Sequence, residues 1–122
     1  MAVEIRKGFI TFPNISFRGG HLTSEIWIAM KDDGPGYNKG DVLTFGGLIL
    51  DSFHPQVGRR VGTDYGMEFI QRVMETTGVT AWHELPGKSC RILAEDSDIF
   101  AIGHATEEKW FRIPNDLDFL RK

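Results

Sequence analysis

Two consecutive arginines stand directly before the one segment of the chain with a clear helical pattern. Arg59 and Arg60 lie in the sequence GRRVG, and Thr63 follows at the expected first turn of the helix. Free N–H groups and the positive end of the helix dipole stabilise an anion there, and arginine adds bidentate hydrogen bonds to phosphate. These three residues predict a site for a nucleotide or a nucleic-acid phosphate. The alternative is a solvated loop whose arginines pair with acidic side chains, since neither a P-loop nor GxGxxG is present.

Three further side chains are candidates for contact with a partner protein. Trp27 lies on the more polar face of an alternating strand at residues 23–31, and Tyr37 and Lys39 lie in the glycine-rich segment DDGPGYNKGD at residues 32–41. Aromatic side chains anchor protein interfaces, and loops present contact residues. The alternatives are that Trp27 packs in the core and that the loop is a flexible hairpin tip.

The remaining reactive residues form no recognisable catalytic or metal-binding pattern. No two histidines have the HxxxH or HxH spacing of metal ligands, and His104 is the one best placed for a polar contact or general base. Cys90 begins a strand and is expected to be a buried structural thiol. The acidic turn at residues 95–98 lacks the pattern of an EF-hand and is expected to be solvated. We therefore predict no catalytic residues, no metal, no cofactor and no enzymatic activity. The four histidines are His21, His54, His83 and His104.

One long helix is predicted at about residues 63–77. Thr63 is a suitable N-cap, and Gly78 is a suitable glycine for the C-terminal end. Gly66 lies inside the apolar arc, where glycine costs about 1 kcal/mol relative to alanine. We therefore expect Gly66 to lie against a strand backbone, and the strand containing Gly46–Gly47 is the matching feature. At 100° per residue the apolar arc contains Tyr65, Gly66, Met67, Phe69, Ile70, Val73 and Met74.

Alternating and β-branched residues predict strands on both sides of this helix. Pro13 lies inside the first, so we expect an edge strand or two short strands separated by a break. Gly46 and Gly47 interrupt the most hydrophobic strand and indicate a bulge or a close backbone approach. Residues 52–61 are expected to connect that strand to the helix. The predicted strands are residues 3–17, 23–31, 42–51, 89–94, 99–105 and 109–113.

The order of these elements predicts an α+β fold in a single domain of 122 residues. A mostly antiparallel sheet of five to six strands is expected to pack on the one main helix. The formal net charge of −3 and the absence of a basic run argue against a dedicated duplex nucleic-acid binder. No apolar run is long enough to span a membrane, and the single cysteine favours a cytoplasmic setting. A homodimer through edge pairing of the first strand is compatible with the sequence, although Pro13 works against a long ladder.

Three segments together resemble small, uncharacterised proteins of tailed phages and prophages. They are FGGLILD at residues 45–51, GTDYGMEFIQRVMETTGVTAWHELPGK at residues 62–88 and IGHATEEKWFRI at residues 102–113. The resemblance implies a viral or prophage setting in the host cytoplasm, and proteins of this kind include accessory factors and inhibitors of host defence. Because no catalytic motif is present, we predict an accessory protein that binds a host or phage protein. Inhibition of host antiviral defence is the leading specific version, and phosphate binding at Arg59 and Arg60 is the alternative.

Overall fold

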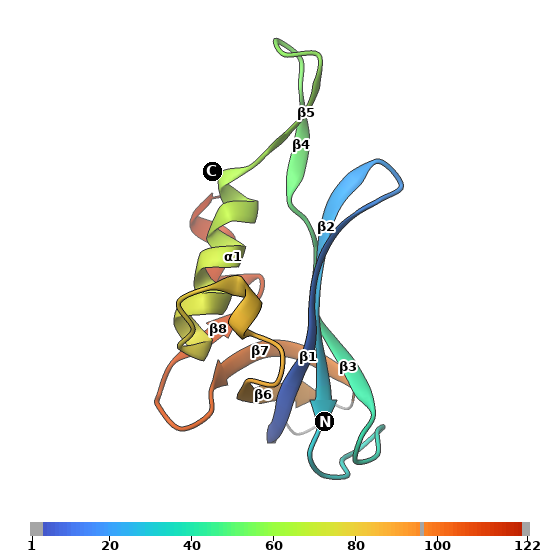
Figure 1. Ribbon diagram of the computed structural model, residues 1–122, viewed down its shortest axis with the longest axis vertical. Helices are drawn as coiled ribbons and strands as arrows, with labels where there is room; N and C mark the ends of the chain where they lie inside the picture. Colours follow the sequence, from blue (N-terminus) through green and yellow to red (C-terminus); the bar gives the residue numbers. More distant parts are fainter. Residues whose placement is uncertain (1–3, 96, 121–122) are drawn as a thin grey trace.

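The computed structural model describes residues 4–95 and 97–120. It contains a six-stranded antiparallel sheet, a separate two-stranded hairpin and one main helix (Figure 1). The predicted α+β class is therefore confirmed. The strands are β1 (Glu4–Arg18), β2 (His21–Met30), β3 (Val42–Ile49), β4 (Asp51–His54), β5 (Arg59–Gly62), β6 (Ser89–Glu95), β7 (Asp98–His104) and β8 (Trp110–Arg112), and the helices are α1 (Asp64–Thr77) and the 3₁₀ turns η1 (Trp82–Glu84) and η2 (Asn115–Leu120).

The six-stranded sheet curls around one face of α1. Its strand order is β3-β2-β1-β6-β7-β8, yet β3 and β7 lie in contact although three strands separate them. Phe45 from β3, Phe69 from α1 and Phe111 from β8 meet inside the curl, with ring centroids 5.9–6.4 Å apart. All three rings are almost completely buried. Aromatic packing between the helix and the two ends of the sheet therefore holds the curl closed.

The ends of α1 follow the chemistry expected from the sequence. The Thr63 hydroxyl accepts a hydrogen bond of 2.9 Å from the backbone N–H of Gly66 and donates one of 2.9 Å to the carbonyl of Leu50. At the other end Gly78 has φ +83° and donates its N–H to the carbonyl of Met74. The left-handed conformation has little cost for glycine, which explains why the helix stops there.

Both glycines at the interface between helix and sheet are in close contact, as expected, but with different partners. An ideal Cβ on Gly66 would lie 2.5 Å from the carbonyl oxygen of Leu50, and one on Gly46 would lie 2.6 Å from the Phe69 ring. The backbone against Gly66 is therefore that of Leu50, the residue between β3 and β4, and not that of Gly46–Gly47. Gly46 has φ +73°, and the pairing of β2 with β3 shifts register at this point, so the predicted bulge is present.

Pro13 lies in a long strand whose two halves have different partners, because β2 pairs with Gly8–Arg18 and β6 with Glu4–Phe9. β6 pairs only with Glu4–Phe9, so the second half of β1 pairs with β2 alone. Pro13 is in this second half, where one side of β1 has no partner strand, and its carbonyl accepts a 3.1 Å hydrogen bond from the Trp82 indole N–H. The strand is continuous, but its register with β2 shifts between Ile10 and Phe12, which leaves Thr11 as an extra residue. The expectation of an edge strand or of two short strands is therefore wrong, because β1 is one strand that lies between β2 and β6 in the sheet.

Two features of the helix and its connection were not predicted from the sequence. Residues 52–61 form most of the β4–β5 hairpin, which projects from the body of the molecule at the top of Figure 1. The apolar arc of α1 is not buried throughout, because Met67 is 63 % exposed. Packing on the curled sheet uses only the side of the helix that carries Gly66, Phe69 and Val73.

Candidate functional site

The side of the sheet facing away from α1 carries a pair of aromatic rings. Phe12 and Trp27 are cross-strand partners in β1 and β2, and their centroids lie 5.2 Å apart in an edge-to-face arrangement. Phe12 is 47 % exposed and Trp27 is half-buried. None of the helices in residues 4–95 and 97–120 lies on this side of β1, β2 and β3 (Figure 1). The expected position of Trp27 on the outer face is therefore confirmed, while its role in binding stays a prediction.

The extra residue in β1 extends this apolar surface along the strand. Without a bulge, residues 9 and 12 would point to opposite faces, because side chains alternate along a strand. The register shift at Thr11 puts Phe9 and Phe12 on one face, since their partners Ala29 and Trp27 are two residues apart. The resulting surface, here called the outer patch, consists of Ile5, Phe9, Phe12, Trp27 and Val42.

Cationic side chains flank the outer patch. Lys7 is exposed on β1 between Ile5 and Phe9, and Arg91 is its cross-strand partner on β6. The Arg91 guanidinium stacks on Trp110 with a distance of 4.8 Å to the ring centroid, and it also pairs with Glu108 at 3.3 Å. The Trp27 indole N–H is buried without an acceptor among the described residues. The surface thus combines apolar area with the positive charge of Lys7.

The other two candidate partner contacts lie in the loop between β2 and β3, and only one is accessible. Tyr37 is 5 % exposed and packs its ring against Gly34 in the core, and burial raises the pKa of its hydroxyl. Lys39 is exposed, and its backbone N–H donates a 2.7 Å hydrogen bond to Asp33. The structure therefore removes Tyr37 from the accessible residues and leaves Trp27 and Lys39.

The groups proposed to bind an anion before α1 have partners within the chain. Arg60 donates to the Asp51 carboxylate at 2.9 and 3.1 Å and to the Asp51 carbonyl at 2.8 Å. The Thr63 hydroxyl is used in the helix cap. Arg59 is exposed and donates to the Arg60 carbonyl at 3.0 Å. Arg60 therefore pairs with an acidic side chain, which was the alternative to anion binding. Arg59 does not form such a pair.

The Asp51–Arg60 pair predicts a specific pH dependence of stability. The hydrogen bond from Arg60, helped by one from the backbone N–H of Leu22, holds the pKa of Asp51 below its ordinary value. A lowered folded pKa contributes stability that is present above the unfolded pKa of about 3.9 and is lost as the pH falls through the folded value. Asp51→Asn should therefore be less stable than the parent at pH 7 and should lose less stability below about pH 4. Denaturant unfolding at several pH values measures this, with Asp118→Asn at an exposed position as the control. If the free energy of unfolding fell equally with decreasing pH in Asp51→Asn and in the parent, the result would contradict this prediction.

His104, the favoured histidine, organises the turn that follows β7. Its Nδ1 accepts hydrogen bonds from the backbone N–H groups of Thr106 at 3.1 Å and Glu107 at 3.0 Å. Its Nε2 lies 3.3 Å from the Glu107 carboxylate. Both ring nitrogens are thus engaged in holding the turn. Burial raises the pKa of Cys90 to about 12, which agrees with the expected structural thiol.

No cluster of metal-ligating side chains is present among the described residues. The acidic turn at residues 95–98 includes Asp96, which lies outside the part of the chain that the structure describes. None of the helices in the described ranges is long and apolar enough to cross a membrane.

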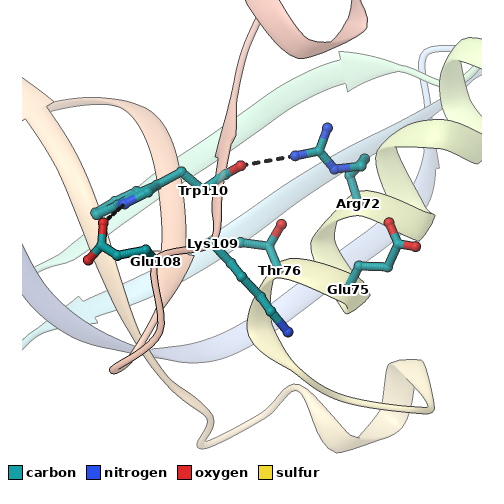
Figure 2. Close-up of a pocket in the computed structure, with 6 residues that line it drawn as sticks. All are labelled: Arg72, Glu75, Thr76, Glu108, Lys109 and Trp110. Carbon is teal, nitrogen blue, oxygen red and sulfur yellow. Dashed lines mark hydrogen bonds between the residues drawn. The ribbon is translucent and has the colours of Figure 1, made fainter.

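A hollow of about 550 Å³ lies between α1 and the segment leading into β8 (Figure 2). Arg72 on one wall donates a 2.9 Å hydrogen bond to the Trp110 carbonyl and lies 3.4 Å from Asp116. The hollow is lined by both positive and negative side chains, and most of them already form ion pairs. The lining therefore does not favour one class of ligand. The sequence pattern does not indicate this hollow, because its walls come from segments far apart in the chain. Its lining residues are Arg72, Glu75, Thr76, Glu108, Lys109 and Trp110.

Comparisons with models of protein families, with curated proteins and with solved structures found no match.

Proposed function

We propose that this protein acts by binding another protein through the outer patch. The observation that carries the proposal is the edge-to-face pair of Phe12 and Trp27 on a sheet face over which no helix of the described residues packs. Residues that dominate binding are enriched in large aromatic side chains, and they act where a partner can exclude water from them. Phe9 and Ile5 continue the apolar surface along β1, which gives the partner an elongated area to cover.

The charges around the patch define the chemistry of this partner. Lys7 is an exposed cation on β1, Arg91 is already paired with Glu108 at 3.3 Å, and Lys39 is exposed on the loop that precedes β3. Complementary potentials steer association and suppress wrong partners. A partner with an apolar centre and acidic residues at its rim therefore fits this face.

The resemblance of residues 45–51, 62–88 and 102–113 to small phage proteins supports a specific version of this proposal. In that version the partner is a host or phage protein in the cytoplasm of the host cell, and binding inhibits a host antiviral defence. Binding of nucleotide or nucleic-acid phosphate at Arg59 and Arg60 stays a prediction. No observation favours it, because Arg60 and Thr63 have intramolecular partners.

Capture from the lysate of infected host cells tests this function. The tagged parent protein should retain one partner in stoichiometric amount, and Phe12→Ala should weaken that complex by about 30-fold or more, as for an interface hot spot. Phe53→Ala is the matched control, since Phe53 is an exposed aromatic on the β4–β5 hairpin away from the patch. Recovery of no stoichiometric partner, or of a partner that Phe12→Ala binds equally well, would count against the proposal.

A further inference from the structure

An apolar strip on α1 is left uncovered by the described part of the chain. Met67 is 63 % exposed, Ile70 and Met74 follow at helical spacing and are partly buried, and Val79 comes just after the helix. Together they border a hollow of about 460 Å³ that is separate from the outer patch, because α1 lies on the opposite side of the sheet (Figure 1). The full lining is Met67, Ile70, Gln71, Met74, Glu75, Val79 and Thr80.

Unpaired negative charge runs along one flank of this strip. Asp64, Glu68 and Glu75 fall within about 40° of one another at the 3.6-residue helical repeat. None of the three has an ion pair among the described residues. Arg72 is the single cation of the helix, and it is held by the Trp110 carbonyl and Asp116. The strip therefore has an acidic border that no cation of α1 neutralises.

We propose that this strip binds a basic amphipathic helix of a partner protein. Such a helix would lay an apolar face on Met67, Ile70 and Met74 and direct lysine or arginine side chains to the acidic flank. Methionine suits this role because its unbranched, polarisable side chain adapts to different apolar shapes. The strip spans about two turns, since seven residues rise about 10 Å.

The charges argue against a second copy of this chain as the occupant. An antiparallel pair of α1 helices would bring the two acidic flanks together on the same side. Like charges in such a position are destabilising, and the engaged Arg72 would not neutralise them. A basic helix removes this repulsion and adds attraction, so it is the occupant that the surface favours.

Methyl NMR of the full-length protein with ¹³C-labelled methionine tests the proposal directly. The probe is a synthetic amphipathic peptide of two heptads with Leu on one face and Lys on the other. Binding should shift the methyl signals of Met67 and Met74 and leave that of the buried Met30 unchanged. A peptide with Glu in place of every Lys should produce no shift at the same concentration. Equal binding of the two peptides, or no binding of the Lys peptide, would overturn the proposal.

Variants test the acidic flank and the apolar strip separately, and they distinguish this site from the outer patch. Glu68→Gln with Glu75→Gln should lower the affinity for the Lys peptide about two- to tenfold, the range for exposed ion pairs. Met67→Gln with Met74→Gln should weaken it by more than about tenfold, through lost apolar burial. Trp27→Ala should leave peptide affinity unchanged, so this test is independent of the function proposed for the outer patch. Concentration-dependent dimerisation that shifts the Met67 and Met74 signals without peptide would overturn the assignment to a basic helix.

Discussion

Replacing Gly46 with alanine is expected to lower the free energy of unfolding by about 2–5 kcal/mol. Gly46 has φ +73°, a conformation that costs an L-residue about 1–2 kcal/mol. The new methyl group would also lie 2.6 Å from the buried ring of Phe69, and overpacking of a core costs about 1–3 kcal/mol. Urea unfolding monitored by circular dichroism measures the change.

Two further variants show whether both causes act. Gly47→Ala is the matched control, because Gly47 lies in the same bulge and does not have a positive φ, and an ideal Cβ on it would meet no atom within 4 Å. It should change stability by less than about 1 kcal/mol. Gly46→Ala combined with Phe69→Leu should be less destabilised than the sum of the single variants, because the smaller side chain relieves the contact. A destabilised Gly47→Ala variant, or strict additivity in the cycle, would contradict this account.

Gly66→Ala is the second large effect that we expect, with a loss of about 1–3 kcal/mol in the free energy of unfolding. In an exposed helix the same substitution would stabilise the protein by about 1 kcal/mol. The sign of the change therefore shows whether Gly66 lies in close contact with the Leu50 backbone. An ideal Cβ on Gly66 would lie 2.5 Å from the carbonyl oxygen of Leu50. That carbonyl cannot easily move, because it accepts hydrogen bonds from both the backbone N–H and the hydroxyl of Thr63.

The same unfolding measurements test Gly66→Ala, with Gln71→Ala as the control on the exposed side of α1. The control should change stability by less than about 0.5 kcal/mol. A more stable Gly66→Ala variant would show that α1 does not pack on Leu50 as described. Truncation of Leu50 offers no relief, because the close contact is made by its backbone.

The two surfaces that we propose as binding sites differ in charge. The outer patch combines apolar area with positive charge at Lys7. The strip on α1 combines methionine with negative charge at Glu68 and Glu75. Since the charges are opposite, we expect the two surfaces to select different partner chemistries.

Local sequence chemistry was sufficient to predict the main helix and its surroundings. The caps at Thr63 and Gly78, the close approach at Gly66 and the bulge at Gly46–Gly47 depend on the conformational needs of single residues and their near neighbours. The α+β class follows from the order of periodic segments in the same way. For these features the information lies within a few residues of each position.

Only the tertiary structure decided which side chains are available for function. The extra residue at Thr11 shifts the side-chain alternation of β1 and so puts Phe12 beside Trp27 on the outer face. The curl of the sheet covers one side of α1 and leaves Met67 exposed, and the fold of the loop buries Tyr37. The pairing of Arg60 with Asp51 depends in turn on a hairpin whose strands were not predicted. Each of these outcomes is set by a contact or register between segments, and hydrophobic periodicity within one segment does not contain that information.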